Sequence, residues 1–205
     1  MLNKTIFLVA VVAVSSIFAQ GMNFGVRAGL NLASVKEDDK EVPEYGNIIG
    51  FHVGAIAYLG LNELFYFQPG FFLSKKGAEN SKEESGLNVE TTMSLWYLEI
   101  PLLASAKIDV NDLALRINAG PYLGFGITGD IESKVQGQSK SEEAFKKGNF
   151  KRLDFGLAFG GGVEFQNFYA GINYNLGLSN IADREDNDDS DIYSRSLGFT
   201  LGYNF

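Results

Sequence analysis

The chain of 205 residues has no cysteine, one histidine, one tryptophan and only 4 prolines. Without cysteine there is no disulfide framework and no thiolate nucleophile, and a zinc site would lack both cysteine and a second histidine. Basic residues are also scarce, because 17 lysines and arginines face 25 acidic residues, giving a net charge of −8. The chain therefore lacks the excess of positive charge that binds a nucleic-acid backbone, and we predict no nucleic-acid partner.

A continuous apolar run occurs only at the N-terminus, and it is short. Lys4 supplies a positive charge, Ile6–Val14 form the run, and small residues follow up to Ala19. This order is that of a signal peptide, whereas a membrane-spanning helix needs roughly 20 apolar residues. We predict a signal peptide over residues 1–19, cleaved after export by the Sec route, and a β-barrel domain over residues 20–205. An uncleaved membrane anchor is the alternative.

Glycine and aromatic residues are abundant, with 24 Gly, 17 Phe and 9 Tyr, a composition that favours β-structure. Apolar residues alternate with small or polar ones, which a strand separates onto its two faces. The first such segment carries on its apolar face Phe24, Val26, Ala28, Leu30 and Leu32. The last carries Leu197, Phe199, Leu201, Tyr203 and Phe205. Eight segments of this kind are predicted, at about 23–32, 51–59, 65–73, 96–105, 113–125, 153–165, 168–178 and 196–205.

The connections between these segments alternate in length. Short turns are expected near Asn62, near Asn111 and at Gln166-Asn167. Long polar loops are expected over Val35–Ile48, Lys75–Thr91, Gly129–Lys151 and Asn180–Ser194. An even number of strands with short turns at one end and long loops at the other is typical of bacterial outer-membrane barrels. We predict an all-β fold, an eight-stranded antiparallel up-and-down transmembrane β-barrel with both termini on the periplasmic side.

The size of the residues on each face indicates which face is inside. A soluble lipocalin-like barrel would also alternate, but it would carry lysine and glutamate repeatedly on its outer face. Here the polar face consists mainly of Gly, Asn and Ser, which fit the narrow lumen of eight strands, and most charged residues fall in the loops. The large apolar residues are therefore expected to face lipid.

A small set of charged and polar residues falls on the predicted inner face. The set is Arg27, His52, Glu99, Lys107, Arg116, Asp154 and Glu164. Buried charges must be paired or hydrated, so we expect a structural network that fills the lumen. The alternative is a polar path for small ions.

Other motifs have plainer explanations than a catalytic or cofactor site. A Ser-His-Asp site on His52, the only histidine, is the enzymatic alternative. Gly124-Phe-Gly126-Ile-Thr-Gly129 matches a dinucleotide-binding pattern, but no helical period follows it. Residues 183–191 hold six acids, whose spacing does not fit a calcium loop. We predict no catalytic residue, no metal and no cofactor.

Several segments resemble the Bacteroidetes family of outer-membrane β-barrel domains that includes the PorT-like proteins. They are residues 25–33 (GVRAGLNLA), 97–103 (YLEIPLL), 120–124 (GPYLG), 154–164 (DFGLAFGGGVE) and 197–205 (LGFTLGYNF). The resemblance implies an eight-stranded barrel in the outer membrane of a Gram-negative cell, in a family that has no catalytic residues to carry over. One group of its members works in protein secretion.

The expected function is that of a non-enzymatic outer-membrane barrel with a filled polar lumen and four surface loops for structural or interaction roles. Its expected partners are outer-membrane lipid and envelope or secretion-complex proteins. An accessory subunit of a secretion or assembly complex and a narrow small-solute channel are the alternatives.

Overall fold

The computed structural model describes residues 22–37, 46–84, 87–135, 138–146, 150–183 and 191–205. Within them the chain forms strands β1 (Asn23–Glu37), β2 (Gly46–Gly60), β3 (Phe65–Glu84), β4 (Leu87–Val110), β5 (Leu113–Val135), β6 (Gln138–Glu143), β7 (Leu153–Phe165), β8 (Phe168–Gly177) and β9 (Ile192–Asn204). The predicted signal peptide, most of the acid-rich segment 183–191 and residues 38–45 of the first predicted loop lie outside this part of the chain.

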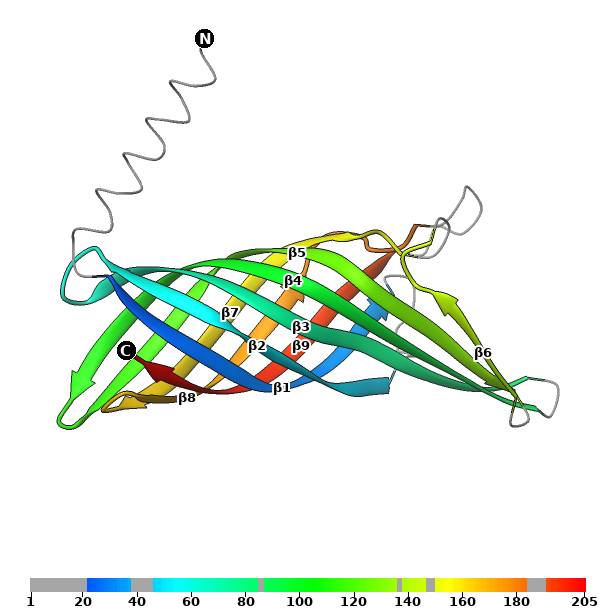
Figure 1. Cartoon of the computed structure of the whole chain (residues 1–205), viewed down its shortest axis with the longest axis horizontal. Coiled ribbons are helices and arrows are strands. Elements are labelled where there is room, and N and C mark those ends of the chain that lie inside the picture. Colours follow the sequence, from blue (N-terminus) through cyan, green and yellow to red (C-terminus); the bar gives the residue numbers. More distant parts are fainter. Residues whose placement is uncertain (1–21, 38–45, 85–86, 136–137, 147–149, 184–190) are drawn as a thin grey trace, which may run out of the picture.

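Eight of the strands form a closed ring. Each pairs with its two neighbours in antiparallel register, and β1 closes the ring against β9. Strand β6 lies outside the ring and pairs only with the far end of β5. The predicted eight-stranded antiparallel up-and-down barrel is therefore confirmed, and Figure 1 shows its strands tilted around a common axis.

The short turns lie together at one end of the barrel, where β1 begins and β9 ends (Figure 1). Asn111 and Gln166 each open a two-residue turn with φ of 55° and 54°, a left-handed conformation that few side chains adopt readily. In the third turn the Asn62 side chain accepts the backbone N–H groups of Leu64 and Phe65 at 2.9 and 2.7 Å. We call this the short-turn end, and the opposite end the long-loop end.

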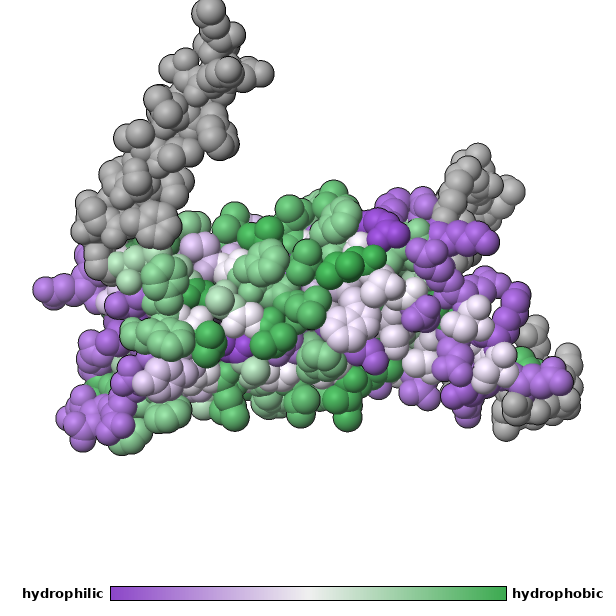
Figure 2. Space-filling model, viewed as in Figure 1, coloured by the Kyte–Doolittle hydropathy of each residue, from purple (hydrophilic) through white to green (hydrophobic). Residues whose placement is uncertain are grey.

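The outer face of the ring is apolar along the middle of the barrel. Phe24, Leu30, Phe71, Ile117 and Leu201 are between 46% and 69% exposed although they lie inside strands. Figure 2 shows hydrophobic residues gathered along the middle of the barrel on the face in view, with hydrophilic residues toward both ends. A soluble barrel would bury such side chains, so this face is suited to lipid. Among the described residues no helix is long and apolar enough to cross a membrane.

Two of the predicted long loops are largely strand. Strands β3, β4 and β5 have 20, 24 and 23 residues, whereas a barrel strand needs only about 9–11 to cross the hydrocarbon core. Their surplus residues, together with β6, form an antiparallel sheet that extends from the long-loop end (Figure 1). We call it the distal sheet; it comprises residues 75–84, 87–96, 128–135 and 138–143. The loops predicted at Lys75–Thr91 and Gly129–Lys151 were thus mostly wrong, because polar strands above the membrane lack the apolar alternation that marks a strand.

The outermost strand of the distal sheet, β6, is exposed at every residue. Its Lys140 and Glu142 form an ion pair of 2.6 Å, and this hydrogen bond raises the pKa of Lys140 and lowers that of Glu142. Charged side chains on an open edge discourage uncontrolled strand pairing.

Candidate functional site: a closed lumen

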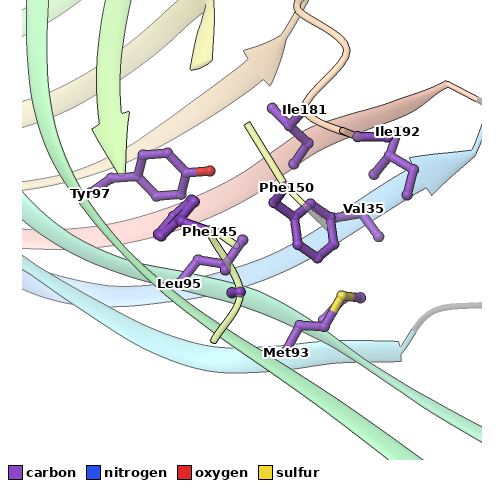
Figure 3. Close-up of a cluster of buried hydrophobic side chains, with 11 residues drawn as sticks. Val35, Met93, Leu95, Tyr97, Phe145, Phe150, Ile181 and Ile192 are labelled. Atoms are coloured by element: carbon purple, nitrogen blue, oxygen red, sulfur yellow. The ribbon is translucent and has the colours of Figure 1, made fainter. Parts of the chain in front are cut away.

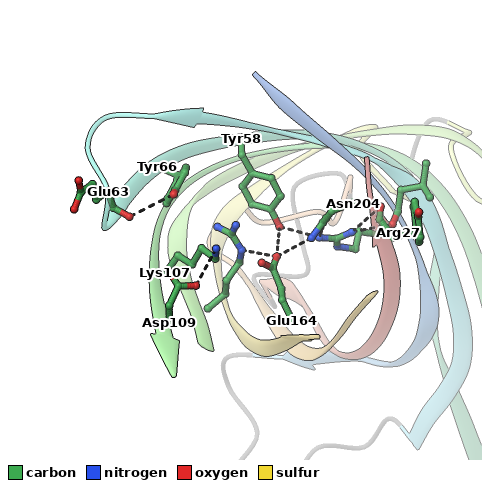
Figure 4. Close-up of polar contacts among 11 residues, drawn as sticks. Arg27, Tyr58, Glu63, Tyr66, Lys107, Asp109, Glu164 and Asn204 are labelled. Atoms are coloured by element: carbon green, nitrogen blue, oxygen red, sulfur yellow. Dashed lines mark hydrogen bonds and ion pairs between the residues drawn. The ribbon is translucent and has the colours of Figure 1, made fainter. Parts of the chain in front are cut away.

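The lumen near the short-turn end is occupied by a charged cluster centred on Glu164 (Figure 4). The Glu164 carboxylate accepts hydrogen bonds from Arg116 Nε at 2.5 Å and Asn204 Nδ2 at 2.9 Å. The Tyr58 hydroxyl lies 3.5 Å from the same carboxylate, and its ring centroid is 3.9 Å from the Arg116 guanidinium. Both partners of the ion pair are about 6% exposed, so this contact is shielded from water.

Arg27 continues this cluster across the lumen. Its Nη2 donates to the Tyr58 hydroxyl at 2.8 Å and to Asn204 Oδ1 at 2.7 Å. Its guanidinium also lies 4.4 Å from the centroid of the Tyr169 ring. Side chains from β1, β2, β5, β7, β8 and β9 therefore meet across this end of the barrel and close it.

His52 lies at mid-height in the lumen and is 6% exposed. Its Nδ1 is 2.8 Å from Asn31 Oδ1, and its Nε2 is 2.9 Å from Thr200 Oγ1. Thr200 in turn donates to Asn173 at 2.7 Å. A Ser-His-Asp triad needs a serine on one ring nitrogen and an acid on the other, and both nitrogens here have different partners.

Nearer the long-loop end, Glu99 forms a buried ion pair with Lys76. The Ser74 hydroxyl donates a hydrogen bond to the other oxygen of this carboxylate, Oε2, at 2.7 Å. The Lys76 ammonium also lies 5.0 Å from the Tyr122 ring centroid and 5.8 Å from that of Tyr97. Sequence reasoning missed Lys76 because the third strand was ended at Leu73. Continuing the alternation through Ser74 would have placed Lys76 inside.

Asp154 is fully buried at the start of β7. It accepts hydrogen bonds from the hydroxyls of Ser194 at 2.8 Å, Ser179 at 3.0 Å and Tyr122 at 3.1 Å. These three partners fix strands β5 and β9 and the segment after β8 to one carboxylate.

Lys107 lies apart from the other six residues of the predicted network. It pairs with Asp109 at 2.9 Å near the end of β4, where its side chain is 28% exposed and that of Asp109 is 65% exposed. The remaining six lie in the lumen, in three separate groups. The first group is Arg27, Arg116 and Glu164, and the second is His52 alone. The third group, nearer the long-loop end, is Glu99 and Asp154.

An apolar plug closes the lumen at the long-loop end (Figure 3). It consists of Val35, Ala78, Met93, Leu95, Tyr97, Ala144, Phe145, Phe150, Ile181, Ala182 and Ile192. Phe145 packs edge-on against Tyr97 with ring centroids 5.8 Å apart. Phe150 forms a β-bridge with Ala182, which ties the segment after β6 to the segment after β8. The described parts of these connections, at Ala144, Phe145, Phe150, Ile181 and Ala182, therefore lie over the barrel mouth and cover the polar groups beneath.

A cavity of about 100 Å³ remains between the charged cluster and the plug. Its walls include Arg27, His52, Gln68, Glu99 and Asn173. The Gln68 Oε1 atom is buried without a hydrogen-bond partner, and a polar cavity of this size can hold a few water molecules. In the described part of the chain, no group of three or more His, Asp or Glu residues is arranged to hold a metal ion.

Comparison with known proteins agrees with this architecture. The model of a family described as outer membrane protein beta-barrel domain matches residues 18–183. The chain belongs to this family. As a member of the outer-membrane β-barrel family it lies in the outer membrane, in contact with lipid. The match does not extend to the PorT-like group or to a Bacteroidetes source, and no curated protein matches the chain.

Solved structures of similar proteins are barrels from other bacteria. Ail of Yersinia pestis is 19% identical, with 89% of this chain and 98% of that chain covered and a TM-score of 0.44. Neisserial surface protein A is 16% identical, with 90% and 99% covered and a TM-score of 0.48. OprG of Pseudomonas aeruginosa is 9% identical, with 91% and 97% covered and a TM-score of 0.46.

Proposed function

We propose that this outer-membrane barrel is a non-enzymatic anchor with a closed lumen, which holds the distal sheet above the membrane for contacts with other molecules. The observation that carries the proposal is the double closure of the lumen. The Glu164 cluster blocks one end and the apolar plug blocks the other, while the surplus residues of β3, β4 and β5 extend outward. The lumenal residues then serve stability rather than transport.

The closed lumen predicts that the protein conducts no ions. We expect purified protein in planar lipid bilayers to give no discrete current steps, because two layers of packed side chains cross the barrel. A general porin inserted in the same bilayers serves as the positive control. Regular current steps that disappear when the protein is omitted would favour the narrow channel instead.

The interaction role can be tested with single cysteines, since the chain has none of its own. We expect Ser141→Cys, on exposed β6, to form cross-linked adducts with a second macromolecule on intact cells. Glu63→Cys, in an equally exposed turn at the short-turn end, is the matched control and should give none with a membrane-impermeant reagent. Absence of adducts from Ser141→Cys and from a second distal site, Ser133→Cys, would contradict an interaction role for the sheet.

The accessory-subunit role in secretion or envelope assembly rests on the sequence resemblance, notably Tyr97–Leu103. Such a subunit would co-purify with a partner in fixed proportion after mild detergent extraction. Recovery of the barrel alone, under conditions that preserve known envelope complexes, would remove this alternative.

We also propose that residues 1–19 are a signal peptide cleaved after Sec export, as the Lys4 charge and the short apolar run indicate. Intact mass of the protein recovered from outer membranes should correspond to a chain that begins near Gln20. A full-length mass would identify an uncleaved anchor.

A further inference from the structure

Strand β6 is joined to the rest of the barrel along one edge only. It pairs with residues 130–135 of β5 and lies outside the closed ring, so every strand of the ring keeps both neighbours when β6 separates. All six of its residues are exposed. A sheet edge with so few buried contacts opens at a lower free energy than the whole fold. Strand β6 can therefore leave β5 while the barrel stays folded.

The chain that follows β6 carries one large apolar side chain, Phe145, into the barrel mouth. Ala144 continues the pairing, because its N–H donates to the Gly129 carbonyl at 2.8 Å. Phe145 is 8% exposed and lies edge-on against Tyr97 (Figure 3). Its ring occupies the space where a side chain on Gly126 would begin. Residues 138–145 thus form an exposed strand with a single buried anchor.

The groups next to Phe145 on the lumenal side are polar and only partly satisfied. Tyr97 is 1% exposed, and its hydroxyl has no hydrogen-bond partner. The Lys76 ammonium lies 5.8 Å from the centroid of the same ring and pairs with Glu99. Ser74 and Glu99 also line the cavity of about 100 Å³. A buried donor without a partner raises the free energy of the closed mouth, and water that enters the mouth would hydrate this layer.

We propose that residues 138–145 are a lid. Strand β6 separates from β5, Phe145 leaves the mouth, and the lumen opens to water at the long-loop end while the Glu164 cluster keeps the short-turn end closed. Opening at one end creates a vestibule and not a pore, so the barrel still conducts no ions. A molecule that contacts β6 in only one of its two positions would shift this equilibrium.

The ladder between β5 and β6 supplies a matched pair of variants. Because the Ala144 N–H faces β5, the alternation of an antiparallel ladder turns the N–H of Lys140 toward β5 and that of Ser141 toward the open edge. Proline has no N–H, so Lys140→Pro removes a bond between the two strands and Ser141→Pro does not. Both positions are exposed and lie outside the apolar plug.

The measurement is the rate at which a small water-soluble maleimide labels single cysteines in the full protein in detergent micelles. The reporters are Ala144→Cys on the lid, Ser74→Cys on the cavity wall and Ser105→Cys nearer the short-turn end, all at buried positions. We expect the first two to react at least tenfold faster than Ser105→Cys. Lys140→Pro should raise both rates by about tenfold, as for loss of one hydrogen bond, and Ser141→Pro should change them by less than twofold.

Three results would each overturn the lid. Equal rates for Ala144→Cys and Ser105→Cys would show that residues 138–145 open only when the whole barrel unfolds. Reaction of Ala144→Cys without reaction of Ser74→Cys would show that the lumen stays closed when the strand moves. Equal effects of the two prolines would show that separation from β5 is not the opening step. Unchanged heat-dependent mobility on a gel shows that the variants are folded. The bilayer and cross-linking experiments do not depend on the lid, so its failure would leave the proposed anchor role intact.

Discussion

Replacing Glu164 with alanine should lower the free energy of unfolding by about 3–5 kcal/mol, the typical cost of removing one partner of a buried ion pair. The loss leaves Arg116 without its carboxylate partner in a part of the lumen that is closed to water. It also removes the acceptor used by Asn204. Urea unfolding in lipid vesicles, followed by the gel mobility of the folded form, measures this change.

Two further variants make the interpretation specific. Lys107→Ala breaks an ion pair that is 28% and 65% exposed, and it should cost only about 0–1 kcal/mol because solvent screens such contacts. The double variant Arg116→Met with Glu164→Leu removes both buried charges and should regain much of the stability lost in Glu164→Ala. If Glu164→Ala were as stable as Lys107→Ala, the charged cluster would not hold the lumen together.

Gly29→Ala should destabilise the barrel by about 1–3 kcal/mol or more, because it overpacks a site that cannot relax. A Cβ atom at this position would lie 2.0 Å from the backbone oxygen of Phe199 and 2.6 Å from the His52 ring. The first neighbour belongs to the backbone of β9, so the strand itself would have to move. The measurement is the temperature at which the compact form on an SDS gel converts to the unfolded one.

Gly161→Ala is the matched control on the outward face of β7. There an added Cβ would lie 3.3 Å from the Arg116 backbone oxygen and 3.8 Å from Ile117, and it would project toward lipid. Alanine also loses less conformational entropy than glycine in a strand, so we expect a change close to zero. Equal losses at Gly29 and Gly161 would show that close strand contact is not the reason for glycine in the lumen.

The strands that cross the membrane could be predicted from sequence because lipid and lumen impose opposite demands on alternate residues. Phe24 to Leu32 and Leu197 to Phe205 show this period without interruption, and the structure forms β1 and β9 there. Above the membrane both faces of a strand meet water or other polar groups. The period then fades, and residues of the distal sheet such as Lys82 and Glu90 were assigned to loops although they lie in strands.

The residues that fill the lumen could be predicted only in part from the same alternation. The period of two places Arg27 and Glu164 on the inner face. Their partners, however, depend on which strands face each other across the lumen, and no local sequence pattern determines that. The plug was missed for a related reason. Phe145 and Phe150 stand in a lysine-rich segment that looks like a solvated loop, and their burial depends on contacts with Tyr97, Ile181 and other residues distant in sequence.

The pairing of the first strand with the last sets the order in which the protein can be made. Residues 25–37 pair with residues 192–204, so the hydrogen-bonded ring cannot close until β9 is available to β1. A chain that ends before β9 leaves one edge of β1 and one edge of β8 open, and hydrocarbon offers no group to satisfy them. A chain truncated before β9 is therefore expected not to form a stable barrel in the membrane.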